Sequence, residues 1–183
     1  MLTNLQKKQV PFATSKALND TANDVQRAET AQLPKKLDRP TPFTMRAFGV
    51  KRSTKRKLIA TVFIKDIQAE YLKYQIEGGR RTTEGKGTGV PYKNKKLNVY
   101  GNIPGRRKGL VKGKRQFIAT IKGIPGVWEV RGKKRAPRLM IAFEKTVRYK
   151  ERFPFVKIAE GTARNRFPRR FSAALEHAMR TAR

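Results

Sequence analysis

Positive charge is the feature of this sequence that most constrains what the chain can fold into. The 183 residues include 44 Lys and Arg but only 13 Asp and Glu, which gives a formal net charge of +31 at pH 7. Charge of one sign at this density repels itself and opposes compaction. The chain also has ten Phe, five Tyr and one Trp, whereas wholly disordered basic tails are poor in aromatic residues. We therefore expect a folded chain that lies beside a polyanion or an acidic protein surface.

Few residues of this sequence are suited to catalysis. The absence of cysteine excludes disulfides, thiolate zinc sites and cysteine nucleophiles. The single imidazole, His177, has no partner motif, and the carboxylates show neither a close pair nor metal-ligand spacing. Residues 85–89 (GKGTG) superficially resemble a phosphate loop, but they lack the Walker pattern and Pro91 follows them. We expect no enzyme activity, no metal and no cofactor.

Helical periodicity marks both ends of the chain. Pro11 suits a first helical turn and Pro34 suits a stop, which predicts a helix over residues 11–33. Residues 165–183 have the clearest apolar stripe in the chain and predict an amphipathic helix with Pro168 in its first turn. Both stripes need a surface to cover them. The candidate residues for oligomer packing are Leu18, Ala22, Val25, Phe167, Phe171 and Leu175.

Strand patterns lie between the two predicted helices. Apolar and β-branched runs predict strands at residues 44–50, 57–65, 116–121, 127–131 and 138–143. A short helix or turn is expected at residues 69–76. Together these elements predict a single α+β domain over residues 1–183, with a mainly antiparallel sheet flanked by N-terminal and C-terminal helices. The sheet would come from residues 44–79 and 116–150. No apolar run approaches the roughly 20 residues that span a bilayer, so we expect no membrane partner.

Residues 80–115 have a different composition from the rest of the chain. They are rich in glycine and poor in aliphatic residues, and no carboxylate occurs from residue 85 to residue 128. We interpret residues 80–115 as a long basic loop, which in a compact domain is usually functional. Its cations, with a further cluster before residue 138, would contact phosphates or an acidic partner without reading base sequence. The candidate contact residues are Arg80, Arg81, Lys93, Lys95, Lys96, Arg106, Arg107, Lys108, Lys112, Lys114, Arg115, Lys133, Lys134 and Arg135.

Three segments resemble a known family. Residues 10–22 (VPFATSKALNDTA) resemble the Ala-rich opening helix of tailed-bacteriophage tail-completion proteins of the lambda minor tail protein Z type. Residues 71–79 (YLKYQIEGG) are similar to a stretch of related neck and tail proteins, and residues 166–178 (RFPRRFSAALEHA) are similar to their terminal helix. The likeness covers both ends and a central patch, and it does not include residues 80–114.

The resemblance implies a virion structural protein that acts late in assembly, at the top of the tail or at the head–tail neck. Such proteins form rings around the DNA channel, so the implied partners are further copies of the chain, other neck, tail and portal-proximal proteins, and genomic DNA bound non-specifically. The implied location is the virion, assembled in the host cytoplasm. The alternative is a ribosomal-type RNA-binding protein, which has comparable charge and basic loops. A nucleic-acid enzyme would need an acid–base or metal constellation that the sequence does not show.

Overall fold

The fold is α+β, as predicted, with long N- and C-terminal helices packed together and small antiparallel sheets between them. The computed structural model describes residues 4–83, 85, 87–104, 111, 115–132 and 135–181. The sequence predicts one domain, whereas the chain divides into two compact units. Unit 1 comprises Met1–Ile76 and Arg152–Arg183, and unit 2 is the continuous segment Glu77–Glu151 between these two parts.

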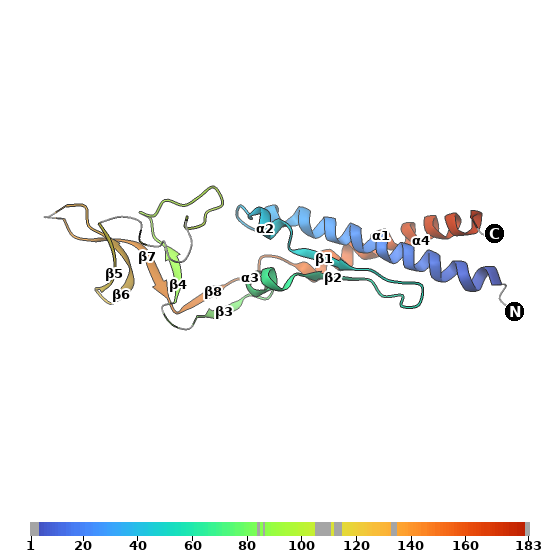
Figure 1. Cartoon of the computed structure of the whole chain (residues 1–183), viewed down its shortest axis with the longest axis horizontal. Helices are drawn as coiled ribbons and strands as arrows, with labels where there is room; N and C mark the ends of the chain where they lie inside the picture. Colours follow the sequence, from blue (N-terminus) through green and yellow to red (C-terminus); the bar gives the residue numbers. More distant parts are fainter. Residues whose placement is uncertain are drawn as a thin grey trace. The chain divides into compact units, whose positions relative to one another are not determined.

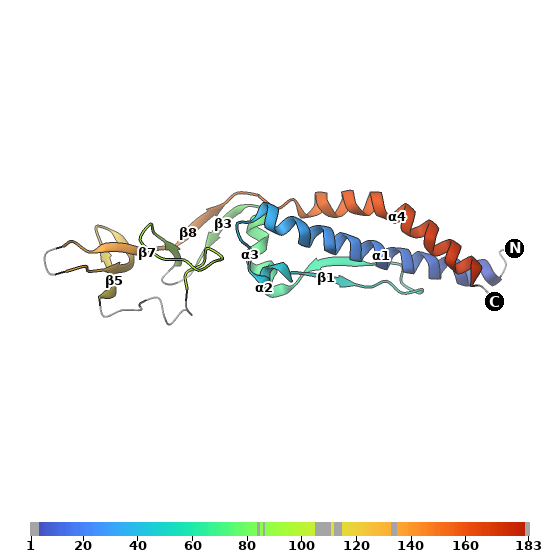
Figure 2. The same cartoon turned by 90° about the horizontal axis from the view of Figure 1, so that it is seen from above.

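Unit 1 is built on two antiparallel helices, α1 (Asn4–Lys36) and α4 (Phe155–Arg180), which lie side by side in both views (Figure 1, Figure 2). Alanine residues spaced four apart lie on one helical face. They form a contact between the N-terminal half of α1 and the C-terminal half of α4. The alanine contact consists of Ala13, Ala17, Ala174 and Ala178, each no more than 2% exposed. Side chains this small let the two helices approach closely.

Both helices are longer than the proline signals predict. The helix predicted over residues 11–33 extends from Asn4 to Lys36, with Pro11 and Pro34 inside it. The helix predicted over residues 165–183 begins at Phe155, and Pro168 also lies inside it. Phe155 packs against the cluster that contains Leu33, so tertiary contacts hold the extra turns despite the prolines.

The other end of the helix pair is closed by an aromatic cluster. Phe153 is 1% exposed, and its ring stacks on Phe48 with the centroids 5.9 Å apart. Phe48 begins a hairpin of two antiparallel strands, β1 (Phe48–Lys51) and β2 (Thr61–Ile64). Gln26 Nε2 of α1 donates a hydrogen bond of 2.8 Å to the Phe48 carbonyl oxygen, which fixes the hairpin against α1.

Two short helices complete unit 1. The first part of the strand predicted at residues 44–50 is instead helical, as part of α2 (Pro42–Met45). Thr41 caps this turn by accepting a hydrogen bond of 3.2 Å from the Thr44 backbone N–H, which is why the segment turns rather than extends. The short helix expected at residues 69–76 is confirmed as α3 (Asp66–Ile76).

Unit 2 consists of two small antiparallel sheets. One pairs β3 (Gly79–Thr82) with β8 (Thr146–Tyr149). The other has the order β4-β7-β6-β5. Its strands are β4 (Thr88–Pro91), β5 (Gln116–Ile121), β6 (Ile124–Glu129) and β7 (Arg138–Glu144).

The core of unit 2 forms where β6 pairs with β7. Val127 and Ile141 are fully buried there. A Cβ at Gly126 would lie 2.2 Å from the Ile141 carbonyl oxygen, so this close approach requires glycine.

Two sequence predictions for this unit are wrong. The predicted loop 80–115 contains most of β3 and all of β4, because their partners β8 and β7 lie far along the chain. Residues 123–126, expected to separate two strands, largely belong to β6, because a two-residue turn at Lys122 and Gly123 already reverses the chain.

Candidate interaction surfaces

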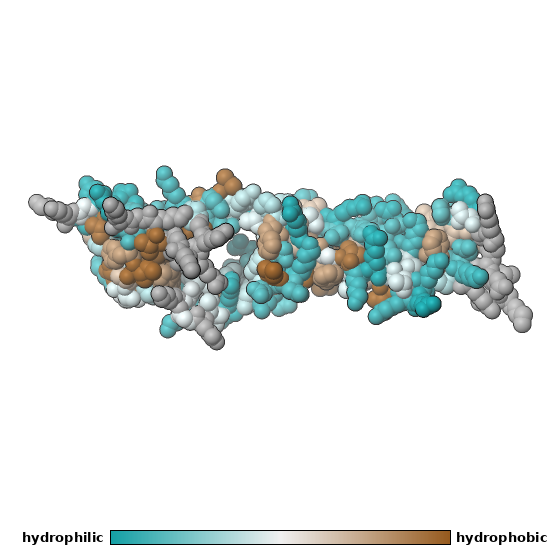
Figure 3. Space-filling view, in the orientation of Figure 1, coloured by the Kyte–Doolittle hydropathy of each residue, from teal (hydrophilic) through white to brown (hydrophobic). Residues whose placement is uncertain are grey.

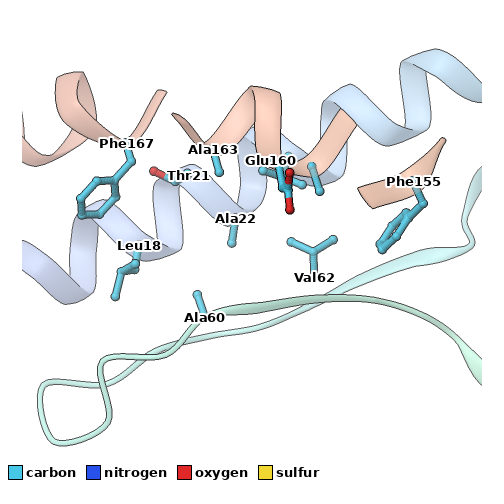
Figure 4. A pocket seen from close by; sticks show the side chains of 11 residues that line it. Leu18, Thr21, Ala22, Ala60, Val62, Phe155, Glu160, Ala163 and Phe167 are labelled. Carbon is cyan, nitrogen blue, oxygen red and sulfur yellow. The ribbon is translucent and has the colours of Figure 1, made fainter. Parts of the chain in front are cut away.

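An apolar hollow of about 450 Å³ lies between α1, α4 and the β1–β2 hairpin (Figure 4). Glu160 is the one charged residue in its lining, and Figure 4 shows its side chain among apolar neighbours. We call this surface the apolar hollow. Its lining residues are Leu18, Thr21, Ala22, Val25, Ala60, Val62, Phe155, Ala159, Glu160, Ala163 and Phe167.

The apolar hollow brings together four of the six residues predicted to pack in an oligomer: Leu18, Ala22, Val25 and Phe167. Ala22 and Val25 are already buried within the chain, so the two terminal helices cover much of each other's stripe. The other two predicted residues, Phe171 and Leu175, lie outside the hollow. They are partly buried and pack against the alanine contact between the helices.

A second surface, the basic groove, lies on a different side of the same helix pair and shares no lining residue with the apolar hollow. Its volume is about 890 Å³. The lining contains four cations and one carboxylate, which leaves a net charge of +3. The lining residues are Asp24, Arg27, Ala28, Ala31, Gln32, Lys157, Ile158, Gly161, Thr162, Asn165, Arg166 and Arg169.

The single carboxylate of the groove is engaged by a cation from outside the lining. Arg170 Nε donates to Asp24 Oδ2 at 2.8 Å, and Arg170 Nη2 donates to Asp24 Oδ1 at 3.0 Å. The hydrogen bond from Arg170 is the main cause that lowers the pKa of Asp24. This bidentate pair joins α1 to α4. Asp24 also forms an ion pair with the groove cation Arg27, whose Nη1 lies 3.9 Å from Asp24 Oδ1, and the charges of Arg166 and Arg27 contribute to the lowered pKa of Asp24.

A buried acid, Glu29, lies on α1. In the sequence it falls between Val25, which lines the hollow, and Gln32, which lines the groove. Glu29 is completely buried, and in the described part of the chain neither of its carboxyl oxygens has a hydrogen-bond partner. Burial raises the pKa of Glu29 to about 8. Glu29 is not among the residues predicted from the sequence to have a functional role. A detectable signal is its spacing, because Glu29 continues the apolar stripe of Val25 and Leu33 at four-residue intervals.

The basic contact residues predicted in unit 2 do not line either surface. Arg80 and Arg81 lie on β3, and Lys93, Lys95 and Lys96 follow β4. Arg115 immediately precedes β5, and Arg135 lies three residues before β7. Seven predicted residues lie outside the described part of the chain: Arg106, Arg107, Lys108, Lys112, Lys114, Lys133 and Lys134. The groove cations Arg27, Lys157, Arg166 and Arg169 are absent from the prediction, and only the pairing of α1 with α4 brings Arg27 to the three cations of α4.

Comparison with known proteins finds no matching family model, no similar curated protein and no similar solved structure. Within the described ranges, no group of three or more His, Asp or Glu residues could hold a metal ion. None of the helices in these ranges is long and apolar enough to cross a membrane. Functional inference therefore depends on the apolar hollow and the basic groove.

Proposed function

We propose that this protein is a structural subunit of a tailed-bacteriophage virion. It would complete or join the tail at the head–tail neck as part of an oligomeric ring around the DNA channel. The observation that carries the proposal is the apolar hollow, because its lining includes Leu18 and Phe167, two partly buried residues expected to pack in an oligomer. A neighbouring subunit that inserts apolar side chains would complete this surface.

Apolar side chains on other surfaces also favour a subunit of a larger assembly. In unit 1, Ile67 is 64% exposed and Val156 is 61% exposed, and in unit 2 Val99 is 77% exposed. Figure 3 shows apolar side chains on the surface of both units. These exposed side chains are available for contact with neighbouring subunits, and a ring needs two different patches on each subunit.

The charge balance supports a location beside DNA. Even if every Asp and Glu were paired with a cation, 31 positive charges would remain. A channel that carries DNA supplies phosphates, and the other neck, tail and portal-proximal proteins would supply acidic surface. Placement in the virion therefore offers partners for both the charge and the apolar hollow.

Deletion of the coding sequence from a phage that carries it tests the proposal. We expect full heads and separate or defective tails by electron microscopy, with normal particles restored by expression of the chain from a plasmid. Infectious particles of normal form without the protein would contradict the proposal. An image of the particle that locates the chain outside the neck and tail top would contradict it as well.

The basic groove also favours the alternative, a ribosomal-type RNA-binding protein. This alternative predicts that the chain co-purifies with ribosomes and is released as salt screens its phosphate contacts. The neck proposal predicts sedimentation with phage particles instead. Fractionation of an infected lysate on a sucrose gradient separates these two outcomes directly.

A further inference from the structure

We infer that the basic groove binds the phosphodiester backbone of a nucleic acid, with Arg27, Lys157, Arg166 and Arg169 as the phosphate contacts. The inference deepens the proposed function, on which it rests for the choice of DNA as the ligand, since it names the surface that would face DNA. Binding is measured on purified protein, so its failure is distinguishable from a failure of the neck proposal.

The cations of the groove are placed by the folded helix pair. Arg27 comes from α1, and the other three come from α4. Lys157 and Arg169 are twelve residues apart on one helix, which corresponds to about 18 Å along its axis. A strand of backbone has several phosphates over that length. The Asp24–Arg170 pair and the alanine contact hold the two helices together, so the cations converge before any ligand binds.

The uncharged part of the lining favours nucleic acid over an acidic protein segment. Gln32, Thr162 and Asn165 are side chains of the kinds that hydrogen-bond to phosphate and sugar oxygens. A protein helix in this groove would need apolar contacts at its centre, yet Ile158 is the one large apolar residue of the lining. Interfaces with nucleic acid are more polar and more positive than interfaces between proteins.

Gly161 is an independent sign that a ligand approaches closely. Glycine within a helix is less stable than alanine. A Cβ at this position would meet no atom within 4 Å, so packing within unit 1 does not require glycine. Since Gly161 lines the groove, its missing side chain leaves room for a ligand backbone.

Salt-dependent DNA binding tests the charge contacts. The probe is a fluorescently labelled duplex DNA of about 20 base pairs, and its anisotropy is measured over salt concentrations from about 50 to 300 mM. In Arg166→Gln/Arg169→Gln, loss of two phosphate contacts should reduce the slope of log K against log salt by about 1.8. The matched control is Arg164→Gln/Arg180→Gln, which removes two exposed cations of the same helix outside the groove.

The control variant should keep the slope of the wild-type chain. An equal loss of slope in both double variants would overturn the inference, because binding would then follow total charge rather than the groove. Circular dichroism melting of both variants checks that the helix pair remains folded.

A steric variant tests the groove without a change in charge. Gly161→Leu should weaken binding to the duplex at least about tenfold at a fixed salt concentration near 150 mM, while Gly161→Ala should bind nearly as well as the wild-type chain. The Cβ of either side chain would meet no neighbouring atom within 4 Å, and circular dichroism melting checks that both variants remain folded. Wild-type affinity in Gly161→Leu would overturn the inference.

Three competitors distinguish the sources of the polyanion. Unlabelled duplex DNA that competes better than duplex RNA of the same sequence supports both the groove and the neck proposal. Stronger competition by RNA supports the groove but contradicts the neck proposal. Polyglutamate that competes as well as DNA at equal charge would overturn phosphodiester recognition, because carboxylates would then serve equally well.

Discussion

The two sides of the α1–α4 pair differ in their chemistry although the same two helices form them. On one side, the apolar hollow contains a single carboxylate, Glu160, and no cation. On the other, the basic groove contains four cations beside Asp24. The β1–β2 hairpin borders only the apolar side, through Ala60 and Val62. A net charge of +31 is therefore compatible with a mainly apolar packing surface that contains no cation, because the helix faces separate the two surfaces.

This difference is the basis for the proposal that the two surfaces bind different partners. We propose that apolar side chains of a neighbouring subunit fill the hollow and that a phosphate backbone binds the groove. A helix pair with one surface of each kind can join subunits on one side and contact DNA on the other. Variants that affect one surface but not the other test this separation.

The largest effect is expected when the helix pair itself is broken, because both surfaces are then lost. Ala174→Asp places a carboxylate in the alanine contact, where Ala174 is 2% exposed. We expect a loss of roughly 3–5 kcal/mol in the free energy of unfolding, since the charge is buried without a partner. Ala173→Asp is the matched control, because the adjacent Ala173 is exposed. Equal melting temperatures for the two variants would contradict the packing of this contact.

The next effect concerns Glu29, the buried acid of α1. The folded chain holds the proton of Glu29 up to a pH of about 8, whereas the unfolded carboxyl releases it near its ordinary pKa of 4.5. Stability should therefore fall as pH rises between these values, by roughly 2.5 kcal/mol from about pH 5 to pH 7. Glu29→Gln should remove this fall in denaturant titrations.

A His177→Gln background, which removes the single imidazole of the chain, isolates the contribution of Glu29. If the stability of Glu29→Gln keeps the full pH dependence in that background, the burial of the Glu29 carboxyl without a hydrogen-bond partner is contradicted.

Filling one surface at a time should weaken one kind of binding and leave the other unchanged. Ala163→Trp fills the apolar hollow and should weaken self-association about tenfold, or roughly 1.4 kcal/mol, as measured by analytical ultracentrifugation. Ala28→Trp fills the basic groove and should weaken DNA binding while self-association is unchanged. Both alanines are half-buried, so the two variants are matched in their demands on the fold. The same loss in both assays from either variant would show that the surfaces act as one.

The smallest effect is expected at Gly161 in the lining of the basic groove. Gly161→Ala should raise the free energy of unfolding by about 0.5–1 kcal/mol, because alanine favours the helix and its Cβ meets no neighbouring atom. Thermal denaturation measures the gain. A destabilised variant would indicate that packing within unit 1 requires the glycine. Gly161 would then no longer indicate that a ligand approaches the basic groove.

The sequence allows the fold class and the apolar hollow to be predicted better than the basic groove. Leu18, Val25 and Phe167 carry a signal because each belongs to a local helical stripe, and local stripes are visible without knowledge of the partner. Arg27 and Arg166 carry none, because they become neighbours only through contacts between the two ends of the chain. The prolines mislead for a related reason. Pro34 and Pro168 act locally, but packing around Leu33 and along the helix pair overrides them.

The division of unit 1 into two parts of the chain has a consequence for synthesis on the ribosome. Ala17 meets Ala174 only after the whole of Glu77–Glu151 has been translated. At about 5–20 residues per second, α1 waits on the order of ten seconds for its partner helix. Unit 2, whose strands pair within one continuous segment, can fold during that delay. Closure of the helix pair can therefore follow the folding of unit 2, and neither surface can form before α4 has been translated.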